Sequence, residues 1–134
     1  MIVLPDTSIW VGYLRHGAKS EPGAQLDSLL EQRSVVVCGP VLAELLAGTP
    51  EGSRIELWSL LSVLPWARLE AEEWRLVGET AARLRAVGET VGLTDITIAV
   101  AAAGAGAALW TRDGDFRRVE RVLPTLGLYD PSGT

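Results

Sequence analysis

The chain has 134 residues and a mass of 14.3 kDa, a length typical of one globular unit, so we expect a single domain over residues 1–134. A hydrophobic content of 48% with only 22% charged residues excludes intrinsic disorder, because the apolar surface is large enough to offset the entropy lost on folding. Seventeen acids and twelve bases give a formal net charge of -5, which excludes a surface that is basic throughout.

Apolar runs bounded by proline and glycine divide the first half of the chain into strands and helices. Ile2–Leu4 is a short apolar run that stops at Pro5, as a strand buried on both faces does. A helix is expected after Asp6, with Gly17 as its stop, because apolar residues recur there at helical spacing. The elements expected next are a helix over Ala24–Gln32, a strand over Val35–Cys38, a helix over Val41–Ala47 opened by Pro40, and a helix over Ser53–Leu64 stopped by Pro65.

The second half continues the alternation of strands and helices. A short strand over Ala67–Leu69 precedes a helix over Glu70–Val87, and Thr94 is expected to cap a helix that begins at Asp95. The remaining elements are a strand over Ala107–Trp110, a helix over Phe116–Leu123 and an edge strand over Leu126–Tyr129. This order predicts an α/β fold with a central, mostly parallel sheet of four to five strands and helices on both faces.

Three sequence features indicate the cellular compartment in which the protein is found. The single cysteine, Cys38, excludes an internal disulfide and a cysteine-based zinc site, and it fits a reducing environment. The segment Met1–Asp6 lacks the basic and apolar regions of a signal peptide, so we expect no export by that route. The uncharged tract Ile96–Trp110 is shorter than the roughly 20 residues of a membrane span. We therefore expect a cytoplasmic protein that does not contact a membrane.

Three acids are the only charged residues of long uncharged segments, namely Asp6, Glu44 and Asp95. Such a group is paired, bound to a metal or located at the edge of the molecule. Asp6 directly follows the first strand, where the carboxyl ends of a parallel sheet line a ligand crevice. Capping of the following helix is an equally open role for Asp6 and Asp95. The helix around Glu44 has no other polar residue, which favours a functional role for this glutamate.

A fourth acidic feature follows the strand Ala107–Trp110. It is the run Thr111–Phe116, which contains Asp113 and Asp115. By itself, an aspartate-glycine turn explains such a run equally well. The four features together are more informative, because all of them occur at strand ends or on helices that flank one edge of the sheet.

These residues resemble the signature of the PIN domain, and the opening Asp6-Thr7-Ser8-Ile9-Trp10 is similar to that of VapC toxins of bacterial toxin–antitoxin pairs. The matching motifs are an aspartate after the first strand (Asp6), a glutamate in the helix after the second strand (Glu44), an aspartate opening an I-A-x-x-A helix (Asp95), and T-x-D-x-D-F (Thr111–Phe116). One departure is Pro5. Because proline donates no ladder hydrogen bond, the first strand is expected to end or pair incompletely there.

The resemblance implies a PIN-like fold and an endoribonuclease that depends on one or two Mg²⁺ or Mn²⁺ ions and leaves a 5′-phosphate. The implied catalytic residues and metal ligands are Asp6, Glu44, Asp95 and Asp113, with Asp115 as a further metal ligand. Thr7, Ser8 and Thr111 would support them, although ordinary turn and cap hydrogen bonds remain an equal alternative. Carboxylates suit this chemistry because hard divalent cations take oxygen ligands and acidify a bound water.

The resemblance also implies partners. RNA would be the substrate, with Arg112, Arg117, Arg118 and Arg121 as contact candidates, unless they form a solvated helix face. We further expect a homodimer or a higher toxin–antitoxin assembly, and a VapB-type antitoxin whose tail lies in a groove from Leu26–Leu30 and Ile55–Leu64. The alternatives left open are an RNA-processing PIN nuclease outside a toxin–antitoxin pair and a catalytically silent PIN-fold binding module.

Overall fold

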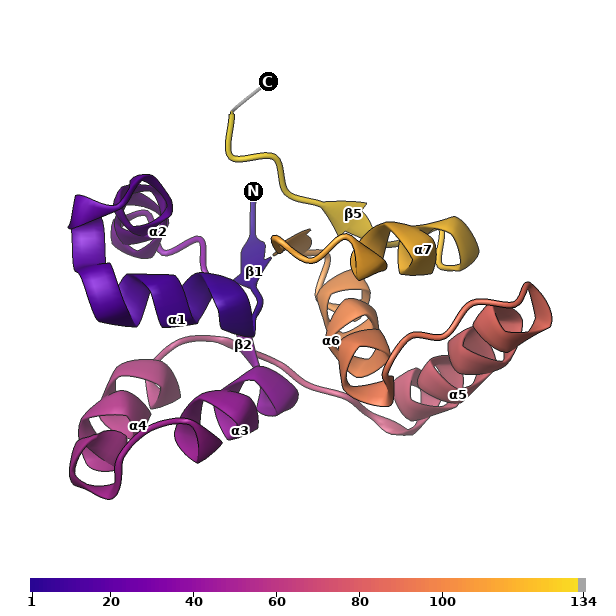
Figure 1. Cartoon of the computed structure of the whole chain (residues 1–134), viewed down its shortest axis with the longest axis horizontal. Coiled ribbons are helices and arrows are strands. Elements are labelled where there is room, and N and C mark those ends of the chain that lie inside the picture. Colours follow the sequence, from indigo (N-terminus) through magenta and orange to yellow (C-terminus); the bar gives the residue numbers. More distant parts are fainter. Residues whose placement is uncertain (133–134) are drawn as a thin grey trace.

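The computed structural model describes residues 1–132 (Figure 1). Its strands are β1 (Val3–Pro5), β2 (Val37–Cys38), β3 (Trp66–Ala67), β4 (Ala108–Trp110) and β5 (Gly127–Leu128). Its helices are α1 (Thr7–His16), α2 (Glu21–Glu31), α3 (Gly39–Ala47), α4 (Arg54–Ser62), α5 (Ala71–Ala86), α6 (Leu93–Gly104) and α7 (Asp115–Val122), with short 3-10 turns at Gly17–Lys19 and Glu51–Ser53. The expected alternation of strands and helices is therefore present.

The strands pair in parallel in two pieces. One piece has the order β1-β4-β5 and the other joins β2 to β3. A parallel bridge between Val3 and Val35 connects them, which gives the overall order β3-β2-β1-β4-β5. The predicted parallel α/β sheet is confirmed, and its centre is the pair β1 and β4.

Pro5 explains why the sheet is divided. The backbone of Val3 bonds toward the β2 side, donating to the carbonyl of Ser34 and accepting from the N–H of Val36. Because successive N–H groups of a strand point to opposite sides, residue 5 would donate toward the same side, and proline has no N–H. On the other side, the N–H of Asp6 donates to the carbonyl of Trp110 at 2.8 Å. Incomplete pairing at Pro5 is thus confirmed, and it does not affect the bond at Asp6.

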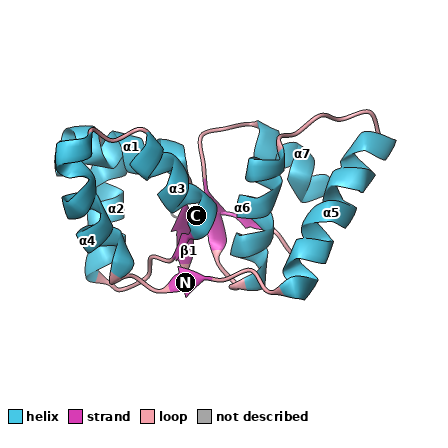
Figure 2. Ribbon diagram, turned by 90° about the horizontal axis from the view of Figure 1, so that it is seen from below, coloured by secondary structure: helices cyan, strands magenta, loops and turns pink. Residues whose placement is uncertain are grey.

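Helices cover both faces of the sheet, as predicted. Helices α1 to α4 lie on one side and α5 to α7 on the other (Figures 1 and 2). Helix α6 is buried continuously from Ile96 to Ala102, which accounts for the uncharged, alanine-rich character of that segment. In residues 1–132, no helix is long and apolar enough to cross a bilayer.

Two local expectations were wrong. Helix α2 begins at Glu21 instead of Ala24, because the Ser20 hydroxyl caps the N–H of Gly23 and Pro22 lies in the first turn. Helix α6 begins at Leu93 with Gly92 as its N-cap, so Thr94 lies inside the first turn and is not the cap. Of the leucines in Leu26–Leu30, Leu26 and Leu29 lie in the core, whereas Leu30 lines a surface hollow together with Val63 and Leu64. The groove expected from Leu26–Leu30 and Ile55–Leu64 stays a prediction.

Candidate active site

The acids singled out from the sequence come from four segments that meet at the carboxyl ends of β1 and β4. Asp6 links β1 to α1, and Glu44 lies on α3. Asp95 lies in the first turn of α6. Asp113 lies in the loop after β4, and Asp115 is the first residue of α7. In a parallel sheet, loops that follow adjacent strands emerge at one edge, which explains their proximity.

Asp6 is 5% exposed and is held by donors on both carboxylate oxygens. Its Oδ1 accepts from the N–H of Ile9 at 3.2 Å and from the hydroxyl of Ser8 at 2.6 Å. Its Oδ2 accepts from the hydroxyl of Thr111. Asp6 is therefore the N-cap of α1 and also a fixed, charged group at the sheet edge.

Thr7 connects Glu44 to the start of α1. The Thr7 hydroxyl donates to Oε1 of Glu44 at 2.6 Å, across 37 positions of the chain. Thr7, Ser8 and Thr111 thus each donate to one of the acids predicted for the site. These hydroxyls restrict the rotamers of the carboxylates and fix where their remaining lone pairs point.

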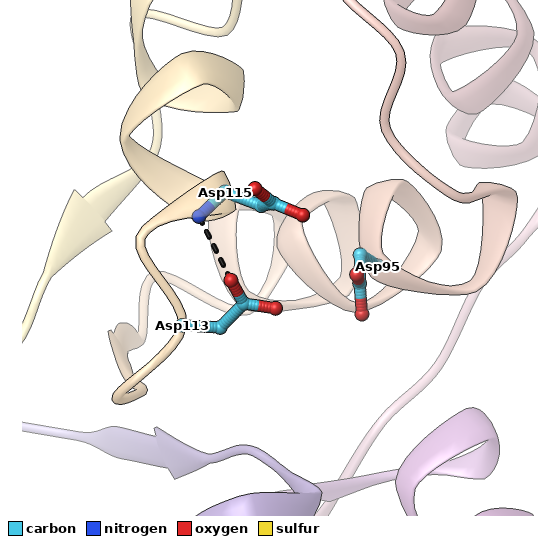
Figure 3. Close-up of side chains that lie close together, drawn as sticks. All are labelled: Asp95, Asp113 and Asp115. Atoms are coloured by element: carbon cyan, nitrogen blue, oxygen red, sulfur yellow. Dashed lines mark hydrogen bonds between the residues drawn. The ribbon is translucent and has the colours of Figure 1, made fainter.

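Asp95, Asp113 and Asp115 form a compact cluster (Figure 3). Each offers one carboxylate oxygen, and these three oxygens all lie within 4.8 Å of one another. The loop geometry is fixed locally: the N–H of Asp113 donates to the hydroxyl of Thr111 at 2.9 Å, and the N–H of Asp115 donates to Oδ1 of Asp113 at 2.9 Å. Such a group of oxygens can hold a cation.

The electrostatics of Asp95 show that all five acids face one region. Partial burial raises the pKa of Asp95, and the negative charges of four other residues raise it further. In order of effect, these are Asp113, Glu44, Asp115 and Asp6. An acid whose pKa rises in the field of several like charges is typical of a site that binds a cation.

Cys38, at the end of β2, lies close enough to Glu44 to feel its charge. Burial raises the pKa of its thiol to about 11, and the charge of Glu44 contributes in the same direction. The thiol is therefore neutral near pH 7. A neutral thiol is a poor nucleophile and a poor metal ligand.

The four arginines near the site differ in their surroundings. Arg118 is half-buried and pairs with Asp115 and, at 3.0 Å, with Oε2 of Glu89. The side chains of Arg112, Arg117 and Arg121 are exposed, and within residues 1–132 none of them forms an ion pair. Sequence reasoning missed Glu89, because an acid in the polar segment 88–90 looks like an ordinary solvated residue.

Comparison with known proteins agrees with this arrangement. The family model of the PIN domain matches residues 3–122. The chain is similar to a chain in the structure of VapBC2 from Rickettsia felis bound to a DNA fragment from their promoter, with 25% identity, a TM-score of 0.74, and coverage of 96% of this chain and 98% of that chain. It is also similar in fold to VapBC-1 from nontypeable Haemophilus influenzae, with 21% identity, a TM-score of 0.75 and coverage of 98% and 99%.

A third similar structure is FitAcB from Neisseria gonorrhoeae, with 20% identity, a TM-score of 0.75, and coverage of 99% of this chain and 100% of that chain. No curated protein sequence matches the chain significantly. The family expected from the four acidic motifs is therefore confirmed by the family model and by the fold.

Proposed function

The chain belongs to the PIN domain family, and we propose that it is a Mg²⁺- or Mn²⁺-dependent endoribonuclease, a toxin of the VapC type that a cognate antitoxin neutralises. The observation that carries the proposal is the cluster of Asp95, Asp113 and Asp115 oxygens within 4.8 Å of one another, with Asp6 and Glu44 beside it. The similarity to the VapBC and FitAcB structures supports the toxin–antitoxin part.

The donor set fits a hard divalent cation. All five acids offer carboxylate oxygens, which Mg²⁺ and Mn²⁺ prefer over nitrogen and sulfur ligands. Their mutual repulsion, visible in the raised pKa of Asp95, would be removed by a divalent charge between them. In this proposal Asp6, Glu44, Asp95 and Asp113 hold the first ion, and Asp115 completes its shell or contributes to a second.

The reaction is hydrolysis of an RNA phosphodiester that leaves a 5′-phosphate. A bound divalent ion would acidify a water molecule and offset the negative charge that develops on the phosphate. The protein prepares the site in advance, because Ser8, Ile9 and Thr111 fix Asp6 and Thr7 fixes Glu44. These groups therefore need little reorganisation during the reaction.

Single substitutions of the site acids test this assignment. Asp6→Asn and Asp95→Asn are each expected to lower the rate of RNA cleavage by about 10³-fold, since each removes a charge that holds the cation. The measurement is cleavage of a labelled RNA in the presence of Mn²⁺. Glu31→Gln, at the exposed end of α2, is the matched control and keeps full activity. Undiminished cleavage by both site variants, with circular dichroism unchanged, would refute the mechanism.

Three arginines are proposed to contact the RNA backbone. Arg112, Arg117 and Arg121 are exposed and belong to the chain segment that carries Asp113 and Asp115, where a guanidinium would neutralise phosphates that flank the scissile bond. Arg118 is different, because it already pairs with Glu89 and Asp115. We therefore assign Arg118 to the support of Asp115 and leave the other three as contact candidates.

The antitoxin is proposed to cover the apolar surface of α4. Ile55 is 79% exposed and Trp58 is 49% exposed, and both border a shallow hollow that also includes Leu46. Large apolar side chains that lie exposed together are typical of a protein-binding surface. Co-expression with the small protein of the same operon is expected to yield a complex, which Ile55→Asp weakens and Val87→Asp, another exposed apolar position, does not.

The oligomeric state is proposed to be a homodimer, or a higher assembly with the antitoxin. Trp74 on α5 and Leu93 at the start of α6 are both more than half exposed, and each offers apolar surface for a contact between copies of the chain. Analytical ultracentrifugation of the isolated chain is expected to give twice the monomer mass. A monomer at all concentrations would contradict the dimer without affecting the nuclease assignment.

A further inference from the structure

A cavity of about 600 Å³ opens beside the acidic site, between α2, the end of β4 and the segment that follows β5. In Figure 1, α2 is indigo and the segment after β5 is yellow. Thr111 belongs to both regions, because it lines the cavity and its hydroxyl donates to Asp6. The volume lies within the range of about 300–1,000 Å³ that small-molecule sites occupy.

The walls of this cavity are fixed by contacts between segments distant in sequence. The side-chain amide of Gln25 on α2 donates to the hydroxyl of Tyr129 at 2.5 Å. The ring of Tyr129 meets the ring of Trp110 edge to face, with centroids 5.3 Å apart. These two contacts hold α2 and the C-terminal segment against β4. The cavity is therefore formed before any ligand arrives.

The lining favours an uncharged group with hydrogen-bond donors. Glu21 and Asp130 contribute carboxylates, while Ala24 and Trp110 contribute apolar surface. The side-chain and backbone groups of Ser132 donate to Asp130 and hold the pKa of its carboxyl below the usual range, so this group is ionised at neutral pH. Two negative charges disfavour a phosphate inside the cavity, and Arg112 is the only positively charged residue of the lining.

We propose that this cavity is a nucleobase-binding subsite for the RNA substrate and that it selects guanine next to the cleaved bond. The inference rests on the proposed nuclease function, because it needs a phosphodiester at the acidic site, from which Thr111 leads directly into the cavity. Proteins read single-stranded RNA by accommodating splayed bases and bonding to their edges.

Guanine fits the acceptors of the cavity better than the other bases. Its N1–H and N2–H groups lie side by side and can donate to one carboxylate, such as that of Glu21. Adenine and cytosine offer one exocyclic amine each. Uracil offers a single N–H between two carbonyl oxygens, which the carboxylates of Glu21 and Asp130 would repel. The expected order of binding therefore places guanosine first and uridine last.

A nucleoside titration tests the subsite without any cleavage. Guanosine, adenosine, cytidine and uridine, which carry no phosphate, are added to isotope-labelled, metal-free protein and followed by amide chemical shifts. We expect guanosine to shift the signals of residues 21–25 and 110–112 and to bind about tenfold more tightly than uridine. Absence of these shifts, or uridine binding as tightly as guanosine, would overturn the proposal.

Two matched variants localise the effect. Ala24→Trp fills the cavity from an exposed position on α2, and Ala82→Trp makes the same change at an exposed position on α5 that does not line the cavity. We expect guanosine binding to be lost in Ala24→Trp and kept in Ala82→Trp. Glu21→Gln is expected to reduce the preference for guanosine over uridine. Equal binding by Ala24→Trp and the unmodified protein contradicts the subsite.

Cleavage mapping separates this proposal from the nuclease function. With Mn²⁺ and an RNA of mixed sequence, the unmodified protein is expected to cut beside guanine, while Ala24→Trp cuts with no base preference. If both proteins cut with the same preference, the subsite is refuted and the nuclease function stands. If neither cuts, the nuclease function fails, and the nucleoside titration still decides whether the cavity binds a base.

Discussion

Asp6 performs two local tasks with one carboxylate. It caps α1 through the N–H of Ile9, and it presents a buried negative charge at the end of β1. Capping and a site role are both open for Asp6 from the sequence, and they are compatible, because the cap bond to Ile9 uses Oδ1 while Oδ2 accepts from Thr111. Thr111 is as important at this scale, since its hydroxyl joins Asp6 to the loop that carries Asp113. A loss of Thr111 would therefore disturb two acids at once.

The raised pKa of Asp95 predicts a stability effect in the metal-free protein. Because the folded-state pKa lies above the unfolded-state value, the folded state binds the proton more tightly, and stability falls as the pH rises through the folded-state pKa. Asp95→Asn removes this loss. We expect the Tm of the metal-free variant at pH 7.5 to exceed that of the unmodified protein by about 3 °C.

The pH dependence provides the control for this prediction. The difference in Tm between Asp95→Asn and the unmodified protein is expected to shrink as the pH is lowered and Asp95 takes up its proton in the folded state. Glu31→Gln also removes one negative charge, but at the exposed end of α2, away from the cluster. We expect it to leave the Tm unchanged. A metal-free Asp95→Asn variant that melts at a lower temperature would contradict repulsion within the cluster.

At the scale of elements, the start of α2 shows how a loop fixes the position of a helix. The 3-10 turn Gly17–Lys19 leads into Ser20, which caps the N–H of Gly23. Gly23 is buried, and a Cβ atom there would lie 1.7 Å from the carbonyl oxygen of Gly17. The sequence pattern predicts this helix only from Ala24 onward. In the structure, residues 21–23 form the first turn of α2, and the close approach of Gly23 to Gly17 fixes the position of this turn.

Gly23→Ala is expected to destabilise the protein. The added methyl group overlaps the backbone of the 3-10 turn, so the turn and α2 must separate, at a cost of about 1–3 kcal/mol or more. Chemical denaturation measures the free energy of unfolding. Gly78→Ala is the matched control, because this exposed glycine in α5 has no neighbouring atom within 4 Å of an added Cβ. Here we expect a gain of about 0.5–1 kcal/mol.

A stable Gly23→Ala variant would show that α2 does not pack closely on the turn. The Gly23→Ala variant also tests the proposed subsite, because Glu21 and Gln25, which line the cavity, lie on the first turns of α2. A shift of α2 is therefore expected to weaken nucleoside binding as well as stability. The Gly78→Ala control keeps both the cavity and its binding.

At the scale of the whole molecule, the net negative charge can be assigned to one region, the proposed site. Without the five site acids, the chain carries twelve acids and twelve bases, so the formal charge of -5 equals that of the site. The excess of acids is therefore located at the proposed site, where one or two divalent ions would offset much of it. The rest of the surface is balanced, and the exposed arginines of the α7 region remain free for phosphate contacts.

Divalent ions are expected to stabilise the whole fold. An ion that binds only the folded state and removes carboxylate repulsion raises the free energy of unfolding, by about 2.7 kcal/mol at a concentration 100 times its dissociation constant. We expect 5 mM Mn²⁺ to raise the Tm by several degrees and EDTA to reverse the change. The measurement is differential scanning calorimetry.

Asp95→Asn distinguishes this stabilisation from a general salt effect. The variant keeps the same fold and surface but lacks one proposed ligand, so Mn²⁺ is expected to raise its Tm much less. The Glu31→Gln control retains the full increase. An equal increase in all three proteins would mean that the ions bind elsewhere, and the acidic cluster would lose its assignment.

The sequence by itself determined the α/β class, the order of strands and helices, the end of α1 at Gly17, the proline in the first turn of α3, and the acids that stand alone in apolar segments. These features depend on local periodicity and on the cost of burying a lone charge. It did not reveal the start of α2, the N-cap Gly92 or the pairing of Glu89 with Arg118. The pairing of Glu89 with Arg118 joins positions 29 apart in the chain, whereas the two helix starts depend on the local backbone conformation at Ser20 and Gly92.

Only the tertiary structure decided which groups meet. The order β3-β2-β1-β4-β5 makes β1 and β4 neighbours, although about 100 residues separate them in the chain, and so brings Asp6 beside Thr111 and the cluster of Asp95, Asp113 and Asp115. The same pairing encloses the cavity between α2 and the C-terminal segment. Sequence patterns record burial and turns residue by residue, whereas the distance between two carboxylates depends on how strands pair across the whole sheet.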